Sequence, residues 1–256
     1  MNRLLDFTGK TVLITGAASG FGALLARTMY QKGVNLALGD CNFDALKQLT
    51  TDLDSSGKRI VIASADVTKE SDCKSLVDAA VSAYGRLDIA VNNAGVAQSM
   101  TSFHEQDEAE FDRQFAINTK GVFFGMKHQI IQMLNQDAGT ILNVSSMAGL
   151  GAAPKLAAYS AAKHAVIGLT KTAAVEYARR NIRINAICPF FSPTPLMSNN
   201  AGMESPEKQE FLAKGSPMKR LAEPQEVVNA MILACAPSNT YMTGQTIAID
   251  GGISAF

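Results

Sequence analysis

The sequence predicts one α/β domain, in which a seven-stranded, mostly parallel sheet carries helices on both faces. Seven short apolar runs alternate with longer stretches whose apolar residues recur at helical spacing. Most positions of each run are apolar, without a regular alternation with polar residues, which is typical of strands buried on both faces. Charged residues make up 18% of the 256 residues, against about 25% in an average domain. This low share favours a sheet that is covered on both faces over one with a solvent-exposed face.

The elements follow in a regular order along the chain. The predicted strands span residues 11–15, 34–38, 59–63, 87–91, 140–144, 182–187 and 246–250. The main predicted helices span residues 21–31, 44–53, 69–84, 110–132 and 157–180. Glycines stand shortly before several of the strands, where the chain must leave a helix and turn back into the sheet.

A proline-rich segment interrupts this order after the sixth strand. Six prolines lie in the segment from Pro189 to Pro224, counting both ends, and the helical spacing there is weak. Long ordered loops in compact α/β domains are usually functional. We therefore expect one domain over residues 1–256, with a substrate loop or lid at residues 190–224.

Composition excludes several classes of protein. The 23 basic and 23 acidic residues cancel, so the chain has no diffuse attraction to nucleic acid or to an anionic membrane. The four cysteines and three histidines are scattered, without the spacing of a metal site or a disulfide framework. No apolar run approaches the length of a membrane span. We expect a cytoplasmic protein that binds no metal, nucleic acid or membrane.

A glycine-rich turn, TGAASGFG at residues 15–22, joins the first strand to the first helix. Small residues let such a turn approach a pyrophosphate, and the helix N-terminus adds N–H donors. The spacing is GxxxGxG, and the GK[ST] of a P-loop is absent. Its position between strand and helix predicts a dinucleotide site that includes Gly16, Ser19, Gly20, Phe21 and Gly22.

Asp40 ends the second predicted strand, 24 residues after Gly16. A carboxylate at this position can accept hydrogen bonds from the ribose hydroxyls of adenosine and repels a 2′-phosphate. The neighbouring positions hold Cys41 and Ser19, so they supply no basic group for NADP(H). This predicts NAD(H) as the cofactor; the alternative is that Asp40 only caps a helix or a turn.

Several further motifs occur in order behind this turn: Asp66-Val67, Asn92-Asn93-Ala94-Gly95, Asn118, Ser146, Tyr159-Ser160-Ala161-Ala162-Lys163, the segment from Pro189 to Thr194, and Asp250-Gly251-Gly252. With them, the chain from about residue 8 to residue 252 resembles the short-chain dehydrogenase/reductase family. The resemblance implies a Rossmann fold, NAD(P)-dependent oxidation or reduction at a carbinol or carbonyl carbon, and a homotetramer or dimer.

Tyr159 and Lys163 lie four residues apart in a predicted helix, so their side chains share one face. An ammonium next to the phenol is expected to lower its pKa from the ordinary value of about 10 toward a working range. Ser146 follows a strand, where its hydroxyl can polarise a substrate oxygen. Ser145 is the rival, and the family's spacing selects Ser146. The resemblance adds that Lys163 binds the nicotinamide ribose and that Asn118 holds a water linked to Lys163.

The resemblance also implies contacts from the remaining motifs. For the adenosine half of the cofactor these are Asp66, Val67, Asn92, Ala94 and Gly95, with helix capping as the alternative role of Asp66. For the nicotinamide half they are Tyr159, Lys163, Pro189, Ser192 and Thr194.

One departure from the family pattern lies beside the nicotinamide segment. Phe190 stands where the family usually has glycine, and its bulk is expected to reshape the nicotinamide pocket. Phe190, Phe191, Leu196 and Met197 are expected to wall an apolar substrate site, in which Ser146 and Tyr159 also contact the substrate. The alternative is that these apolar residues pack in a subunit contact.

The predicted function is therefore NAD(H)-dependent interconversion of a secondary alcohol and a ketone, with Tyr159 as general acid/base. One alternative is a 3-oxoacyl thioester reductase of the same family, which usually uses NADPH. Another is a non-catalytic NAD(H) sensor, although a sensor has no need of the serine, tyrosine and lysine together.

Overall fold

The computed structural model describes residues 3–54, 56–198 and 205–255. Its strands form one sheet with the order β3-β2-β1-β4-β5-β6-β7, and each neighbouring pair is parallel. The strands are β1 (Thr11–Thr15), β2 (Asn35–Asp40), β3 (Ile60–Ser64), β4 (Ile89–Asn92), β5 (Gly139–Val144), β6 (Ile182–Pro189) and β7 (Thr246–Ile249). This is the Rossmann-like sheet that the sequence predicts.

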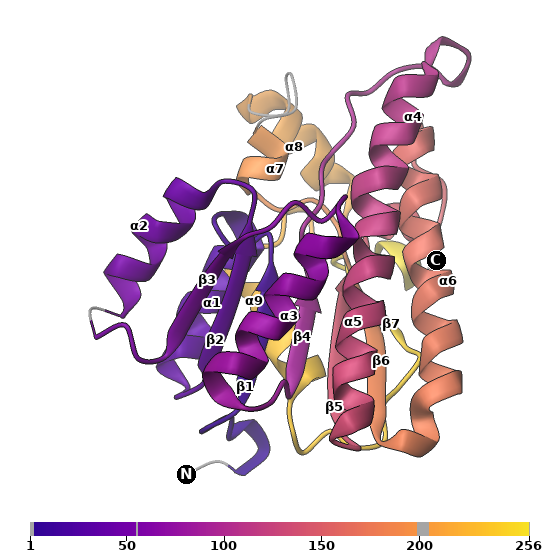
Figure 1. Cartoon of the computed structure of the whole chain (residues 1–256). Coiled ribbons are helices and arrows are strands. Elements are labelled where there is room, and N and C mark those ends of the chain that lie inside the picture. Colours follow the sequence, from indigo (N-terminus) through magenta and orange to yellow (C-terminus); the bar gives the residue numbers. More distant parts are fainter. Residues whose placement is uncertain (1–2, 55, 199–204, 256) are drawn as a thin grey trace.

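Helices cover the sheet on both faces (Figure 1). They are α1 (Gly20–Gln31), α2 (Phe43–Leu53), α3 (Glu70–Tyr84), α4 (Glu108–Gln114), α5 (Gly121–Asn135), α6 (Ala157–Tyr177), α7 (Pro195–Ser198), α8 (Pro206–Gly215) and α9 (Pro224–Cys235). In Figure 1, α3, α5 and α6 lie in front of the sheet, and α1 and α9 lie behind it. No described helix is long and apolar enough to cross a membrane.

The apolar strands separate two hydrophobic cores because successive side chains point to opposite faces of the sheet. On β1, Val12 and Ile14 join the core that contains residues of α1 and α9. Leu13, between them, joins the core that contains residues of α3, α5 and α6. A strand with a core on each side has no solvated face, which explains why its sequence is apolar without alternation.

The strand order reverses between β1 and β4, so a crevice opens above their carboxyl ends. Hydrogen bonds tie the two strand ends together at this point. The backbone N–H groups of Asn93 and Ala94 donate to Thr15 Oγ1, each at 3.1 Å, and Asn93 Nδ2 donates to the carbonyls of Thr15 and Gly16 at 3.0 Å. The glycine-rich turn is thereby held against the loop that follows β4.

The structure corrects one sequence prediction and describes only part of the segment of another. The predicted helix at 110–132 is three segments, because a π-helical turn over Phe115–Lys120 separates α4 from α5. Within the predicted loop at 190–224, the structure forms α7 and α8, while residues 199–204 lie outside the described residues.

Candidate active site

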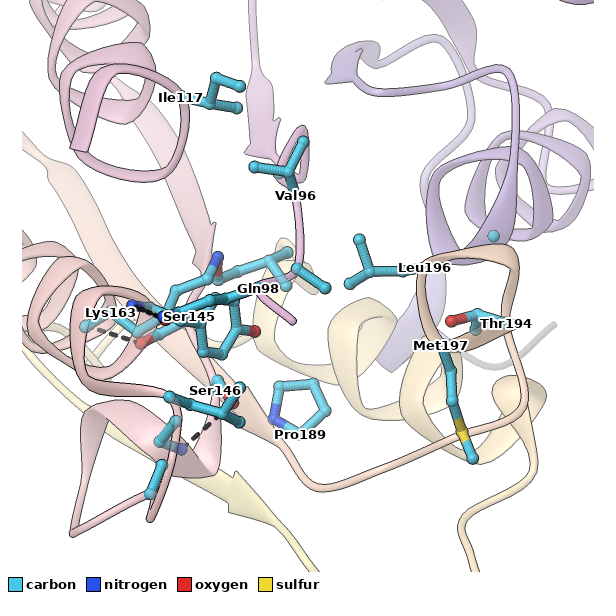
Figure 2. A pocket seen from close by; sticks show the side chains of 18 of the residues that line it. Val96, Gln98, Ile117, Ser145, Ser146, Lys163, Pro189, Thr194, Leu196 and Met197 are labelled. Atoms are coloured by element: carbon cyan, nitrogen blue, oxygen red, sulfur yellow. Dashed lines mark hydrogen bonds between the residues drawn. The ribbon is translucent and has the colours of Figure 1, made fainter. Parts of the chain in front are cut away.

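A cavity of about 1320 Å³ lies at the carboxyl ends of the strands and runs from the glycine-rich turn to the N-terminal part of α6. Figure 2 shows the part of its wall that includes Ser146, Lys163 and Pro189. The cavity is larger than the about 300–1,000 Å³ of an ordinary ligand pocket. Its lining includes most of the predicted site residues: Gly16, Ser19, Gly20, Phe21, Asp40, Asp66, Val67, Ala94, Gly95, Ser146, Tyr159, Lys163, Pro189, Phe191, Ser192, Thr194 and Leu196.

Gly16 lets the turn pass close to the loop after β4. Its φ is +63°, and a Cβ on this residue would lie 2.7 Å from Ala94 Cα. The turn leads into α1, whose N-cap residue Ser19 makes no side-chain capping bond and whose first turn has no acidic residue. Backbone donors at the start of α1 are therefore left for an anionic group in the cavity.

The Asp40 carboxylate lies at the tip of β2 and lines the same cavity. Its Oδ2 accepts a hydrogen bond from the Ala18 backbone N–H at 2.9 Å, and its Oδ1 accepts one from the Asn42 N–H at 2.8 Å. Asn42, not Asp40, caps α2. The carboxylate thus supports the glycine-rich turn and presents a negative charge beside it.

Asp66 and Val67 follow β3 and line the cavity beyond Asp40. Thr68 donates to Asp66 Oδ1 through its backbone N–H at 3.0 Å and its hydroxyl at 2.7 Å. The hydrogen bonds from Thr68 hold the pKa of the Asp66 carboxyl below its ordinary value, although partial burial opposes this. The N-cap residue of α3 is Lys69, so the turn formed by Asp66 lies ahead of the helix rather than at its cap.

Ser146, Tyr159 and Lys163 come together on one wall of the cavity. Ser146 follows β5 and accepts a hydrogen bond from the Ala148 N–H at 3.1 Å, and its side chain lowers the pKa of Tyr159 in part. Lys163, one turn along α6, lies with its Nζ 5.7 Å from the centre of the Tyr159 ring. The hydroxyl of Ser145 instead donates to the Lys163 carbonyl at 2.9 Å.

The pKa of Tyr159 differs from the sequence expectation. Burial raises the pKa of the phenol above its ordinary value, and the hydrogen bond with Ser146 opposes that shift only in part. Lys163 is itself 4% exposed and donates to the Val144 carbonyl at 2.9 Å. Burial lowers the pKa of its ammonium to about 8. The predicted lowering of the phenol pKa by Lys163 is therefore wrong for this structure, because loss of hydration dominates.

Three predicted residues do not line the cavity. A Cβ on Gly22 would lie 2.1 Å from the Gly16 carbonyl oxygen, so this glycine allows α1 to pack under the turn. The Asn92 side chain is buried and donates to Gln129 and Asn143, away from the cavity. Asn93, which the prediction passed over, lines the cavity instead. The alternation of side chains along β4 is the signal that could have separated the two asparagines.

Asn118 is the third of these residues, and it lies in the π-helical turn. Its amide is fully buried and brackets the backbone of Val96: Oδ1 accepts from the Val96 N–H at 3.0 Å and Nδ2 donates to the Val96 carbonyl at 2.9 Å. Asn118 therefore holds the loop that follows β4. The predicted water linked to Lys163 stays a prediction.

The predicted substrate segment begins where β6 ends. Phe190 keeps a backbone outside the left-handed region, and its ring packs edge-on against Phe191 with 4.9 Å between ring centres. Both phenylalanines line the cavity, as do Leu196, which is 43% exposed, and Met197, which is buried. Ser192 donates to the Ala222 carbonyl at 2.7 Å and so fastens this segment to the loop before α9.

Comparisons with known proteins agree with this architecture. The chain is 34% identical over 255 residues to a 2,5-dichloro-2,5-cyclohexadiene-1,4-diol dehydrogenase from Sphingobium indicum, which covers 98% of this chain and 99% of the relative. A structure of ElxO with NADP bound is similar with a TM-score of 0.90 at 32% identity, over 96% of this chain and 99% of that one. A 3-ketoacyl-(acyl-carrier-protein) reductase from Brucella melitensis complexed with NADH has a TM-score of 0.89 at 31% identity, over 97% and 99%.

The family comparison covers nearly the whole chain. Residues 16–254 match the profile described as enoyl-(acyl carrier protein) reductase. This match includes the glycine-rich turn, the loop after β4 and the segment that carries Ser146, Tyr159 and Lys163. The chain belongs to the short-chain dehydrogenase/reductase family of oxidoreductases.

Proposed function

We propose that this protein is an NAD(H)-dependent oxidoreductase that interconverts a secondary alcohol and a ketone by hydride transfer. The observation that carries the proposal is that Ser146, Tyr159 and Lys163 line the same cavity as the glycine-rich turn and Asp40. A phenol, a hydroxyl and an amine at one end of a dinucleotide-sized cavity are the groups that carbonyl reduction requires.

The cradle suits a dinucleotide. Gly16 and Gly20 have no side chains that would block the turn, and α1 starts with uncapped backbone donors, so a diphosphate can bind there. Asp40 would accept hydrogen bonds from the adenosine ribose, and Pro189, Ser192 and Thr194 would border the nicotinamide. When bound, the nicotinamide supplies or accepts the hydride, and the protein supplies position and proton transfer.

In the reductive direction, Tyr159 would donate the proton that the carbonyl oxygen gains. The pKa of the partly buried phenol lies above its ordinary value, which keeps the proton in place at neutral pH until a substrate oxygen takes it. Ser146 would orient that oxygen, since its hydroxyl lines the same cavity as Tyr159. Lys163 would hold the ribose. In the oxidative direction the phenolate would accept the proton.

A panel of secondary alcohols and ketones tests this function, assayed with NAD(H) and with NADP(H). Cyclic alcohols belong in it because one relative is named for a cyclohexadienediol. We expect turnover of at least one alcohol–ketone pair. Tight NADH binding without turnover of any member would favour the non-catalytic sensor instead.

A 3-oxoacyl thioester reductase is the second candidate. The structure from Brucella melitensis is such a reductase and is complexed with NADH, so the presence of Asp40 is no argument against this activity. Acetoacetyl-CoA in the same panel separates the two candidates. A rate constant for the thioester far above those for simple ketones would replace the first proposal by the second.

The preference for NAD(H) rests on Asp40. Asp40→Asn keeps an amide oxygen that can accept from the Ala18 N–H, but it removes the charge that would face a 2′-phosphate. We expect the ratio of kcat/KM with NADH to that with NADPH to fall about tenfold or more. An unchanged ratio would show that Asp40 does not select the cofactor.

We further propose that the protein works in the cytoplasm as a homotetramer or dimer, with residues 190–224 as its substrate loop. Support for assembly comes from large apolar side chains that are half exposed on α5 and more exposed on α6 and α9: Phe123, Ile131, Val175 and Leu233. The loop assignment is supported by Phe191 and Leu196, which line the cavity.

A further inference from the structure

Gln98 carries a buried polar atom without a partner, in the wall of the cavity. The residue lies in the loop after β4, is 2% exposed and lines the cavity. Of the buried side-chain polar atoms in the described residues, Gln98 Nε2 and Thr11 Oγ1 make no hydrogen bond. An amide N–H₂ withdrawn from water without a partner destabilises the folded state, so native structures rarely keep one without a reason.

The orientation of this amide is fixed by the backbone. Gln98 Oε1 accepts a hydrogen bond from the Tyr159 N–H at 2.9 Å, in the first turn of α6. If the amide were reversed, the N–H₂ group of Gln98 would face the backbone N–H of Tyr159, and two donors would oppose each other. The unpartnered group is therefore a hydrogen-bond donor, and it is carried by the same side chain that holds the backbone of Tyr159.

Apolar side chains contribute to the wall of the cavity around Gln98. In Figure 2, Gln98 lies between Val96 and Ser146 in the view, with Lys163 to one side of it and Leu196 to the other. Val96, Ile117 and Leu196 line the same cavity. A donor in such a wall gains most from an acceptor oxygen that a bound molecule brings with it.

The charges at this end of the cavity disfavour an anionic acceptor. Asp107 and Glu110 line it, and Arg113 is already paired with Glu110, with N···O distances of 2.7 and 2.9 Å. Lys163 is bonded to the Val144 carbonyl. A carboxylate would meet two acidic side chains and a neutralised arginine. The oxygen that fits is a neutral one.

We propose that Gln98 is a specificity-determining residue that donates a hydrogen bond to a second, neutral oxygen of the substrate. The inference rests on the proposed function and narrows its substrate class. The alcohols and ketones that this protein prefers carry a hydroxyl or keto oxygen close to the reacting carbon, in addition to the oxygen that faces Ser146 and Tyr159.

Gln106 supplies a matched control. Its Oε1 accepts from the Ala158 N–H at 3.3 Å, so it also supports the first turn of α6. Its Nε2, however, already donates to the Thr101 carbonyl at 3.1 Å, and Gln106 does not line the cavity. Gln106→Met therefore removes support for α6 without touching the substrate donor.

The experiment compares wild type, Gln98→Met, Gln98→Glu and Gln106→Met on paired ketones: 2-butanone with 3-hydroxy-2-butanone, and cyclohexanone with 2-hydroxycyclohexanone. Gln98→Glu keeps an acceptor for the Tyr159 N–H and removes the donor. We expect both Gln98 variants to lose kcat/KM about tenfold more on the hydroxyketone than on its partner, the effect of one lost hydrogen bond. Gln106→Met should change both members of a pair alike.

Binding of the same ketones to the NADH complex, followed by nucleotide fluorescence, separates this inference from the proposed function. Absence of turnover by the wild type counts against the proposed function alone. The inference is overturned if the Gln98 variants weaken both members of each pair equally, if they weaken neither, or if the hydroxyketones bind no better than the plain ketones.

Discussion

The side-chain amine of Lys163 is buried, and burial lowers its pKa to about 8. The pKa of a lysine in an unfolded chain is about 10.4. Between these two values the unfolded chain binds a proton that the folded protein does not, so the folded state loses stability as the pH falls. The cost is complete below about pH 8 and vanishes as the pH rises toward about 10.4.

Lys163→Met should remove this cost. We compare the free energy of unfolding of the variant with that of the wild type at each pH. The variant minus wild-type difference should be highest near neutral pH and should fall by up to about 3 kcal/mol as the pH rises from about 7 to about 10. The lost bond to the Val144 carbonyl offsets part of the gain, by an amount that does not depend on pH. Urea unfolding without cofactor at several pH values measures the difference. A difference that is constant or grows with pH would contradict the account.

At the scale of residues, sequence spacing predicts well which side chains line the cavity. It predicts less well the chemical role of each of these side chains. Tyr159 and Lys163 could be found because four residues along a helix fix a common face. The sign of the Tyr159 pKa shift could not, because it depends on burial by segments distant in the sequence. Gln98 was passed over for the same reason: an isolated glutamine gives no sequence signal until the folded chain closes around it.

At the scale of elements, the glycine-rich turn depends on one close approach. Gly16→Ala would place a Cβ 2.7 Å from Ala94 Cα at a φ of +63°. Gly57 is the matched control, because its φ is +65° and a Cβ there would meet nothing within 4 Å. Both substitutions place alanine in the left-handed region, which lowers the free energy of unfolding by about 1–2 kcal/mol. Only Gly16→Ala adds a steric overlap with the backbone, which lowers it by about 1–3 kcal/mol more.

Chemical unfolding and an NADH titration test this difference. We expect Gly16→Ala to lose more stability than Gly57→Ala and to bind NADH at least about tenfold more weakly, since the turn must shift away from the loop after β4. Gly57→Ala should bind NADH as the wild type does. Equal effects of the two substitutions on NADH affinity would show that this close approach does not shape the site.

The segment from α4 to α5 shows what element prediction could not reach. Apolar spacing over residues 110–132 indicated one helix, and most of that span is helical. The π-helical turn inside it places Asn118 against the Val96 backbone, on a loop 22 residues earlier. Such a turn is held by a tertiary contact rather than by local propensity, so periodicity alone gives no sign of it.

At the scale of the whole molecule, the proposed assembly follows from apolar surface. Phe123 and Ile131 on α5 are about half exposed, and Val175 on α6 is 81% exposed. Light scattering coupled to size exclusion should give a mass about four or two times the 27.2 kDa of one chain. A mass of one chain at micromolar concentration would contradict the proposal.

The overall architecture was the most predictable level. Alternation of apolar runs with helical stretches gave the seven strands, with boundaries that differ by a few residues at most. The reason is that each parallel strand is buried on both faces, so its composition is nearly independent of its neighbours. The segment after β6 was the least predictable, because Phe190, Phe191 and Leu196 take their places through contacts specific to this chain.

The central claim is that the Tyr159 hydroxyl transfers the proton while the rest of the cavity holds the cofactor and the substrate. Tyr159→Phe removes one oxygen and leaves the ring, and the measurement pairs its kcat with its NADH dissociation constant. We expect kcat to fall by about 10²–10⁴ while NADH affinity stays within about threefold of the wild type. A variant that turns over at a rate near that of the wild type would contradict the claim.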